Sequence, residues 1–473
     1  MVSFIRILII GLGLSVPFAS MYAEDADSLV VDTILIYRDS DAPTVVKAID
    51  ALPTVASAYG TPAVDSIPKF IYSVGGGAGM NRMLNITIRG DKLVKRGWGS
   101  NYSIFATSQA NPLDTAISVY DRVFGFPTME AGVLLMDYSH VRMHTEDTPY
   151  MSCPGYVWAA YLAFHRDIYR NQKWSFGYSL ENGLSLCSRP YNARSNVDND
   201  LIGQHLSLYV GFGLHAGYRI TPQVELGMSF EYKHNSNGAT DRPNKGSNAY
   251  GLTMHARCDV NRPPSDKGLT YHERLRLLQG FKREPFDTYM YLDIDATVGF
   301  RTLYEEWLLR RDYMTSEERI ANDGKLGLHT VWSTGITPMV RYNQVHASGL
   351  GIEYAFAGYL ARSPMIEKMC GVKKNYRHSK HTLYIAAHHE VYYKQISVPM
   401  SLGTYLFRQH GWVGDFYEPP LVETIGIRYY PKFFKPFYVG YNVKANLGKA
   451  YAMEVKVGMH AGHWRLKKKA AKE

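Results

Sequence analysis

The sequence of 473 residues has little of what marks redox or zinc-binding domains. It contains only four cysteines, Cys153, Cys187, Cys258 and Cys370, and no two of them form a Cys-x-x-Cys pair. Their wide spacing indicates neither a zinc ribbon nor a redox motif. Isolated apolar cysteines are the simpler interpretation, and disulfides stay open because an oxidising compartment would allow them.

Long hydrophobic runs are also missing. After residue 23 no stretch of about 18 uncharged apolar residues occurs, so no membrane-spanning helix is expected. The first residues differ, because Arg6 precedes an apolar run from Ile7 to Val16 and small residues follow up to Ala23. This order is typical of a secretory signal peptide, and its apolar core is too short to cross a bilayer. We therefore predict a signal peptide over residues 1–23.

Charge of one sign is not concentrated anywhere except at the end of the chain. Charged residues make up 20% of the sequence and the formal net charge is +9. A positive balance fits a partner that carries phosphates, such as a lipopolysaccharide surface or a nucleic acid. The basic residues form no stripe, and the basic tail over residues 465–473 is best interpreted as a solvated terminus. We do not expect nucleic acid as a partner.

Most of the remaining chain shows a period of two. Residues 24–98 alternate poorly, contain several prolines and a short helical candidate from Thr44 to Leu52, and are predicted to form an N-terminal periplasmic extension. Residues 99–464 consist of segments near ten residues separated by polar or glycine-containing turns. In one segment Trp174, Phe176, Tyr178 and Leu180 oppose Ser175, Gly177, Ser179 and Glu181.

Alternation of this kind suits either a soluble sandwich or a membrane barrel. The signal peptide, the 36 tyrosines and the strand length favour the barrel, with its apolar face toward lipid. Fifteen candidate strands begin near residues 101, 129, 154, 173, 204, 222, 248, 288, 329, 349, 382, 397, 421, 435 and 451. Because single-chain bacterial barrels have even strand numbers, we predict an all-β, transmembrane antiparallel β-barrel of about 14 strands, with 12 to 16 open. The charged segments 261–286 and 303–326 are predicted to be long loops.

Two further features carry no predicted chemistry. The run from Ser73 to Gly79 is rich in glycine but lacks a Gly-Lys-Ser ending, so we interpret it as a flexible turn and not as a phosphate loop. His378, His381, His388 and His389 could be imagined as metal ligands, yet neighbours on a strand such as His388 and His389 point to opposite faces. We expect no metal and no other cofactor.

The informative stretch runs from Val224 to Gly238. Leu226, Met228, Phe230 and Tyr232 share one face of the predicted strand with His234 and Ser236. A histidine and a serine two residues apart on one face can act as base and nucleophile, although an interfacial polar pair is the simpler reading of a lone His-x-Ser. Here the pair ends a lipid-facing stripe, at the depth where acyl ester bonds of lipids lie.

The next strand is predicted to bring further polar groups to this pair. Asn248 shares a face with Tyr250 and Leu252, so hairpin pairing would let it approach His234. Asn244 and the backbone amides of Asn237 and Gly238 could then surround a developing oxyanion. Asparagine is also common in turns, because its side chain forms hydrogen bonds with nearby backbone groups. The alternative is therefore that both asparagines only stabilise the turn.

These residues carry a family resemblance. His234-Asn-Ser236-Asn237-Gly238, followed by Pro243-Asn244-x-Gly246, resembles the PagL-like lipid A 3-O-deacylase or acyloxyacyl hydrolase family, in particular its long, Bacteroidetes-type members. The resemblance covers about residues 100 to 260. It implies a barrel in the cell outer membrane, lipid A of lipopolysaccharide as substrate, outer-membrane lipids as surroundings and an ester hydrolase site that faces the bilayer.

Carried over to this chain, the resemblance makes Ser236 the nucleophile and His234 the general base. Asn237, Gly238 and Asn244 would be oxyanion or positioning groups. The third member of the triad departs from the pattern, because Asn248 stands where the best-known members have Glu. An amide can orient a neutral imidazole, but it cannot stabilise an imidazolium by charge.

The sequence therefore predicts a serine esterase that removes an acyl chain from lipid A and needs no metal. Two alternatives remain open. One is a non-enzymatic outer-membrane barrel, such as a pore, a transporter or a scaffold, and the other is a phospholipase. Nothing in the sequence indicates an oligomeric state.

Overall fold

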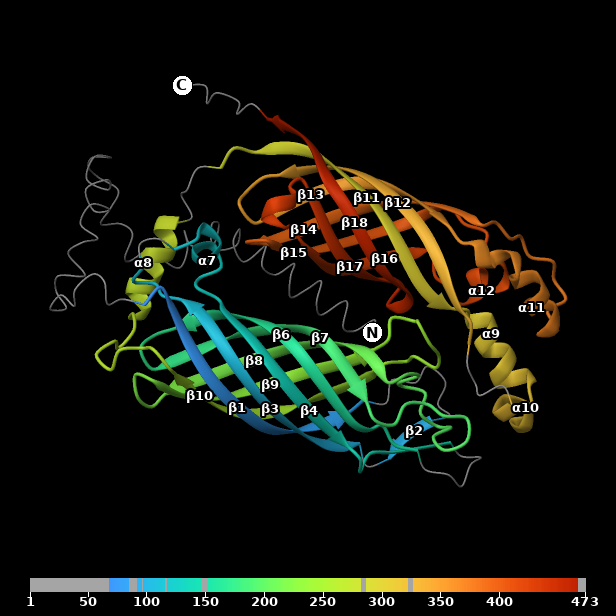
Figure 1. Cartoon of the computed structure of the whole chain (residues 1–473), viewed down its shortest axis with the longest axis horizontal. Coiled ribbons are helices and arrows are strands. Elements are labelled where there is room, and N and C mark those ends of the chain that lie inside the picture. The colour runs from blue at the N-terminus through green and yellow to red at the C-terminus, as the bar shows by residue number, and fades with distance from the viewer. Residues whose placement is uncertain are drawn as a thin grey trace, which may run out of the picture.

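Two closed β-barrels lie side by side in the computed structural model of the chain (Figure 1). Each barrel has eight strands, and all strand pairs described below are antiparallel. The structure describes residues 68–84, 92–95, 97–114, 117–145, 152–281, 286–321 and 326–466.

Barrel 1 is formed by the first part of the chain, with neighbouring strands in the order β1-β10-β9-β8-β7-β6-β4-β3. Its strands are β1 (Phe70–Met83), β3 (Trp98–Ala110), β4 (Thr128–Tyr138), β6 (Gly155–Arg170), β7 (Trp174–Cys187), β8 (Leu206–Arg219), β9 (Val224–Ser236) and β10 (Ser247–Asp259). Two short strands, β2 (Lys92–Lys95) and β5 (Arg142–Thr145), pair with each other outside the barrel.

Barrel 2 follows in simple up-and-down order, and β18 pairs with β11 to close it. Its strands are β11 (Tyr289–Thr302), β12 (Leu328–Arg341), β13 (His346–Phe356), β14 (His381–Tyr393), β15 (Ile396–Phe407), β16 (Leu421–Tyr429), β17 (Phe437–Asn446) and β18 (Lys449–Arg465).

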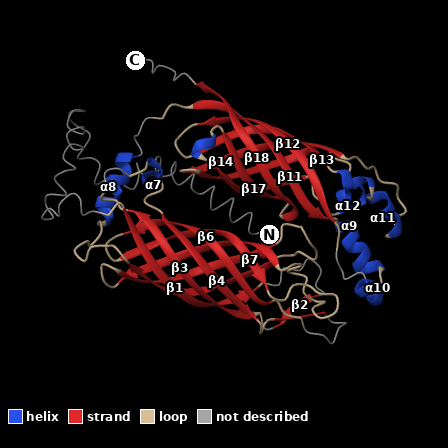
Figure 2. Cartoon of the chain, in the orientation of Figure 1, coloured by secondary structure: helices blue, strands red, loops and turns tan. Residues whose placement is uncertain are grey.

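Short helices occupy the connections between strands (Figure 2). Near one end of the molecule lie α7 (Val119–Val123), α8 (Tyr271–Phe281) and η5 (Lys432–Phe434). The other end carries α9 (Tyr304–Leu308), η3 (Leu309–Tyr313), α10 (Ser316–Ala321), η4 (Gly358–Ala361), α11 (Ser363–Met369) and α12 (Gly411–Phe416). Among the described residues, no helix is long and apolar enough to span a membrane.

The two ends differ in loop length, which orients the barrels. At the end with α7, several connections are tight turns, such as 171–173, 220–223 and 394–395. At the opposite end the connections are mostly longer, including 188–205, 237–246 and 357–380. Outer-membrane barrels have short periplasmic turns and longer extracellular loops. The end that holds residues 237–246 is therefore the outer-surface end.

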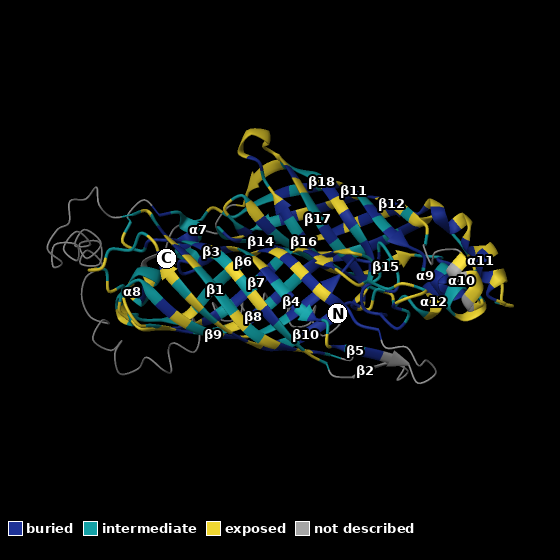
Figure 3. Ribbon diagram, turned by 60° about the horizontal axis from the view of Figure 1, so that its bottom comes forward, coloured by how far each residue is buried: buried dark blue, intermediate teal, exposed yellow. Residues whose placement is uncertain are grey.

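Apolar side chains lie outside the barrels and charged side chains lie inside them. Ile104 and Met254 are each 70% exposed on the outer face, whereas Lys233, Lys444 and Arg428 are buried in the lumens. The exposed and buried positions alternate along the strands (Figure 3). This is the reverse of a soluble protein and fits strands that face lipid. An eight-stranded barrel has an interior just wide enough for side chains, which here fill it with ion pairs such as Lys444 with Glu353 at 2.8 Å.

The barrels contact each other along their length. At the periplasmic end Tyr393 of barrel 2 donates to Asp121 of α7 at 2.5 Å. In the middle, outward apolar side chains of β7 to β9 pack on those of β15 and β16, including Phe212 and Met400. At the outer end the backbone amide of Thr302 donates to the carbonyl of Ala239 at 2.8 Å. The second barrel therefore lies next to the loop that follows β9.

The all-β, transmembrane antiparallel architecture expected from the sequence is confirmed, and the 16 barrel strands lie at the upper limit of the expected range. The prediction of one barrel over residues 99–464 is wrong, because the strands form two separate closed barrels. Residues 260–288, which include α8, connect the two barrels. The predicted extension over 24–98 contains β1 and β2, and the basic tail begins at Arg465, the last residue of β18.

The remaining expectations concern the N-terminal segments, the cysteines and two predicted loops. The predicted signal peptide over 1–23 and the helical candidate from Thr44 to Leu52 lie outside the described residues. The four cysteines are free, with only Cys258 exposed. The expected loops 261–286 and 303–326 are indeed connections, but both contain helices.

The glycine-rich run that the sequence suggested to be a turn is instead the middle of β1. This strand pairs with both β10 and β3, so it closes barrel 1. Its glycines stand where neighbouring strands come close: a Cβ on Gly75 or Gly79 would overlap backbone atoms of β10. The outward alternation persists through Tyr72, Val74 and Met80, all more than half exposed.

A glycine on the partner strand tests this close approach. A Cβ on Gly251 of β10 would overlap the carbonyl oxygen of Met80 in β1. We expect Gly251→Ala to destabilise the protein by about 3 kcal/mol, because backbone atoms cannot move aside as side chains do. Guanidinium unfolding in detergent micelles, followed by tryptophan fluorescence, measures the loss. Gly358→Ala is the control, since its nearest neighbour would be a Phe356 ring atom at 3.6 Å, and an equal loss in both variants would refute the explanation.

Candidate active site

The hairpin of β9 and β10 brings the predicted residues together at the outer-surface end of barrel 1. Ser236 is the last residue of β9, and His234 pairs directly with Asn248 of β10. His234 and Ser236 follow the alternation of Leu226, Met228 and Phe230, each close to half exposed on the outer face. The strand therefore carries its polar pair on the lipid-facing side, as the sequence pattern indicated.

Asn248 holds the imidazole of His234 in one orientation. Its Oδ1 lies 2.8 Å from Nδ1 of His234, and its Nδ2 donates to the carbonyl of Gly246 at 3.0 Å. Because the Gly246 carbonyl accepts from the amide nitrogen, the amide oxygen must face the histidine. The Nδ1 atom then carries the proton, and the neutral ring has its lone pair at Nε2.

Tyr232 is a member of this arrangement that the sequence analysis did not select. Its hydroxyl also donates to Oδ1 of Asn248, so the amide oxygen has two donors. The signal was present, because Tyr232 shares the outward face with His234. A tyrosine on a lipid-facing strand is ordinary, because its ring suits the membrane interface, so its position alone does not predict a role in the site.

Two hydrogen-bond donors converge on the hydroxyl of Ser236. Nδ2 of Asn244 lies 3.2 Å from Oγ, and the backbone amide of Gly238 lies 3.4 Å from it. Asn244 is oriented in turn by the backbone amide of Asn237, which donates to its Oδ1 at 3.1 Å. The loop therefore presents a side-chain donor and a backbone donor to the same oxygen.

The side chain of Asn237 shapes the loop. Its Nδ2 donates to the carbonyl of Asp241 at 3.1 Å, and its Oδ1 accepts from the amide of Ala239 at 3.0 Å. These bonds hold a turn in which Gly238 has a φ of 63°. Asn237 thus acts on Ser236 through Asn244 and the backbone.

Asp241 lies in the loop between β9 and β10 and is the sequence's candidate for a carboxylate in place of Asn248, but it does not contact His234. Its carboxylate accepts from the backbone amide of Arg242 at 2.8 Å, and burial raises the pKa of this carboxyl. The Nδ1 side of His234 is occupied by Asn248. Among the described residues, the third member of the arrangement is therefore an amide.

Gly246 lets the imidazole lie against the loop. It has a φ of 76°, and a Cβ there would overlap the His234 ring. A glycine at this position therefore serves both the turn and the close approach of the ring.

Barrel 2 covers part of the site. Met453 of β18 lies over Gly238, where an added Cβ would be 3.0 Å from that of Met453. Arg242 stacks on the ring of Tyr304 of α9, with 5.0 Å between the guanidinium carbon and the ring centre. His234 and Ser236 are left 5% and 6% exposed. The sequence could not indicate this cover, because it comes from segments more than 60 positions away.

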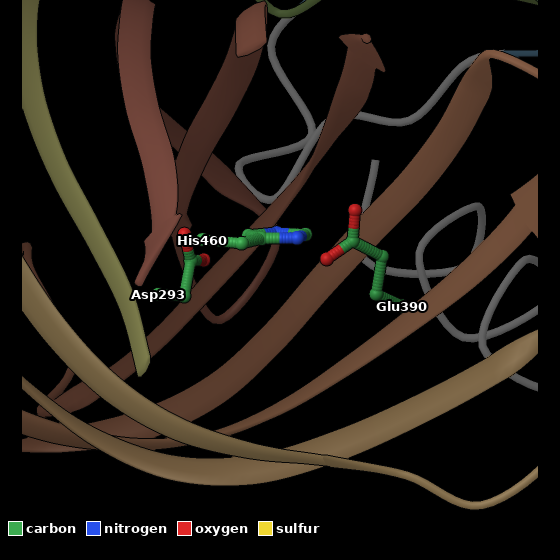
Figure 4. Close-up of side chains that lie close together, drawn as sticks. All are labelled: Asp293, Glu390 and His460. Carbon is green, nitrogen blue, oxygen red and sulfur yellow. The ribbon is translucent and has the colours of Figure 1, made fainter. Parts of the chain in front are cut away.

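A second polar cluster lies in the lumen of barrel 2. Asp293, Glu390 and His460 have ligand atoms within 4.8 Å of one another (Figure 4). Arg428 bridges the two carboxylates, at 2.8 Å from Asp293 and 3.0 Å from Glu390. A guanidinium already supplies the positive charge that the carboxylates need, so the cluster is an ion-pair network that fills the lumen. The four histidines considered from the sequence are not part of it.

Comparisons with known proteins agree with the two-barrel division. The family model of lipid A 3-O-deacylase (PagL) matches residues 137–257, from the end of β4 through most of β10. The model of the acyloxyacyl hydrolase C-terminal domain matches residues 291–465, which is almost all of barrel 2. Together the two models match more than half of the chain. It belongs to the lipid A 3-O-deacylase and acyloxyacyl hydrolase family.

The family resemblance seen in the sequence is thereby confirmed, and the second match extends it to barrel 2. As a member of this family the chain is an outer-membrane protein. No curated protein matches it. The two family matches therefore carry the assignment.

Solved structures with a similar fold are distant. Neisserial surface protein A has 12% identity and a TM-score of 0.25, and the match covers 41% of this chain and 98% of that one. The outer membrane enzyme PagL has 13% identity and a TM-score of 0.23, covering 39% and 97%. A mutant porin from Rhodopseudomonas blastica has 7% identity and a TM-score of 0.14, covering 83% and 99%. At these values the neighbours say nothing about the site.

Proposed function

We propose that this protein is an outer-membrane serine esterase that removes an acyl chain from lipid A, with Ser236 as nucleophile and His234 as general base. The observation that carries the proposal is the orientation of the Asn248 amide. It fixes the proton on Nδ1 of His234 and leaves Nε2 as the basic atom, on the strand face that Ser236 shares. The family assignment supplies the substrate class.

The proposed reaction has two halves. Nε2 of His234 takes the proton of the Ser236 hydroxyl, and Oγ attacks the ester carbonyl of lipid A. Nδ2 of Asn244 and the amide of Gly238, which donate to Oγ in the free site, turn to the former carbonyl oxygen and stabilise its negative charge. The departing alcohol takes the proton back from His234. Water activated by His234 then hydrolyses the acyl-enzyme. The products are a free fatty acid and lipid A with one acyl chain fewer.

The place of the site in the membrane supports this substrate. Ser236 lies at the outer-surface end of a strand whose outward face meets lipid. The ester bonds of lipid A lie just below its headgroup, so they come to the same depth. Buried ion pairs in both lumens, such as Lys233 with Glu231 in barrel 1 and Lys444 with Glu353 in barrel 2, argue against the alternative of a pore.

Mass spectrometry of lipid A tests the proposal. Full-length protein in detergent is incubated with lipid A, and we expect the loss of one acyl chain, whose mass identifies the bond that is cut. Ser236→Ala is expected to leave lipid A intact, because the attacking oxygen is gone. Ser229→Ala, prepared in the same way, is the matched control, since Ser229 lies on the lumen side of the same strand.

Other outcomes discriminate among the alternatives. Release of fatty acid from glycerophospholipid, with lipid A untouched, would replace the proposal with a phospholipase. Equal deacylation by the native protein and Ser236→Ala would disprove the assigned nucleophile. No hydrolysis of either lipid, under conditions in which an established deacylase is active, would favour a non-enzymatic barrel.

A further inference from the structure

A large apolar groove begins beside the candidate site. It has a volume of about 1030 Å³ and is lined almost entirely by apolar atoms. Most of its lining residues belong to barrel 1, and many of them, such as Ile104 and Leu162, are strongly exposed on the outer face. The groove is therefore open to the lipid and does not lie in the lumen.

Barrel 2 provides one wall of the groove at the end nearest Ser236. Tyr441 of β17 and Met453 of β18 both line it. The Tyr441 hydroxyl donates to Asn182, a polar residue on the outer face of β7, and so joins the barrels at this point. Met453 also lies over Gly238, whose amide contacts Ser236. Without barrel 2 this end of the groove would be open.

The strand register connects Ser236 to the groove in a continuous line. Ser236 pairs with Leu208 of β8, Leu208 with Leu184 of β7, and Leu184 with Ala160 of β6. The line continues from Ala160 to Val133 of β4 and then to Ile104 of β3. All of these positions after Ser236 line the groove.

This line also descends into the membrane. Ser236 is the final residue of β9 at the outer rim, whereas Leu208, Ala160 and Ile104 are the third, sixth and seventh residues of strands that start at that rim. Five inter-strand steps of about 4.8 Å make a line roughly 24 Å long. With strands tilted about 40°, it descends roughly 15 Å, which is half of the hydrocarbon core. The groove thus runs from the depth of ester bonds to the middle of the bilayer.

We propose that this groove holds the scissile acyl chain during hydrolysis and that barrel 2, through Met453 and Tyr441, sets which chains can enter. The inference rests on the proposed function of Ser236. An acyl chain is the occupant that fits, because the lining is apolar, the groove opens to lipid, and its upper end adjoins the serine. Barrel 2 then determines which acyl chains the enzyme accepts, in addition to forming one wall of the groove.

Chain-length selectivity tests the proposal in the full-length protein. Hydrolysis of p-nitrophenyl butanoate and p-nitrophenyl hexadecanoate is measured in detergent micelles for the native protein, Ala160→Trp and Met453→Trp. The indole would fill the middle of the groove in the first variant and its mouth in the second. We expect the hexadecanoate to butanoate ratio of kcat/KM to fall about tenfold or more in both, since tight apolar sites discriminate by this much.

Met254→Trp is the matched control, because Met254 is equally lipid-facing, 70% exposed on β10, and does not line the groove. A ratio that falls equally in the control and in Ala160→Trp would overturn the groove. A ratio that falls in Ala160→Trp but not in Met453→Trp would overturn the role of barrel 2.

A binding measurement separates this inference from the proposed function. Hexadecanoate with a diazirine at its terminal carbon is crosslinked to Ser236→Ala, and the labelled peptides are identified by mass spectrometry. We expect labels on β3, β4 and β6 in excess of those around Met254. If the labels are found there but ester hydrolysis does not depend on Ser236, the groove stands and the proposed nucleophile fails. Labels spread evenly over the outer face would overturn the groove even if Ser236 is essential.

Discussion

Turnover of an ester substrate is expected to fall by about 10⁴-fold or more in His234→Ala, because the serine hydroxyl loses the base that activates it. The double variant His234→Ala/Ser236→Ala should be no slower than the more damaged single variant. Residues that act as one unit are strongly non-additive, since removal of either already disables the step.

Initial rates on p-nitrophenyl butanoate and release of fatty acid from lipid A provide the measurements. His272→Ala is the matched control, since His272 is an exposed residue of α8 at the opposite end of barrel 1. A His234→Ala variant within tenfold of the native rate would mean that another group acts as base. Fully additive losses in the double variant would mean that the two residues do not work together.

Asn248 is expected to be essential in its amide form. We expect Asn248→Ala to lower turnover by about 10²- to 10⁴-fold, because the imidazole loses the acceptor that fixes its proton on Nδ1. Asn248→Asp is expected to lower turnover about tenfold or more instead of raising it. An aspartate would place an oxygen 3.0 Å from the Gly246 carbonyl, where the native Nδ2 donates a hydrogen bond. The repulsion would turn the carboxylate away from His234 or keep it protonated.

Rates at several pH values for the two variants, with folding checked by circular dichroism, decide this point. Asn244→Asp is a useful comparison at the same loop, because it too exchanges an amide for a carboxylate but next to the serine oxygen. Faster turnover in Asn248→Asp than in the native protein would show that the site lacks only a charge. In that case the amide of Asn248 would limit turnover, and its hydrogen bond to the Gly246 carbonyl would not be required for activity.

The hairpin site could be anticipated from the sequence because its geometry is local. A period of two places His234 and Ser236 on one face, and a short connection to β10 leaves few registers for Asn248. The donors from Asn244 and Gly238 follow from the same loop. The side-chain role of Asn237 was less accessible, because it depends on the path of the turn through Asp241.

The number of barrels, in contrast, could not be predicted from the sequence. Fifteen of the 16 barrel strands begin near candidate positions, and only β1 was missed, because its glycines hide the alternation. Closure depends on β1 pairing with β10 and on β11 pairing with β18, strands that are more than 150 positions apart in both cases. Periodicity describes each strand and says nothing about which distant strand is its neighbour.

The sequence by itself determined the strand alternation and placed His234, Ser236 and Asn248 on one face of a hairpin, because these features depend on residues within one strand or one hairpin. It favoured an outward apolar face only through the signal peptide, the tyrosines and the strand length. The tertiary structure decided that there are two barrels, that Met453 lies over Gly238 and Tyr441 lines the apolar groove, and that this groove begins at Leu208, the pairing partner of Ser236. These features arise from contacts between segments far apart in the chain, where shape and packing select the partner and no local pattern records it.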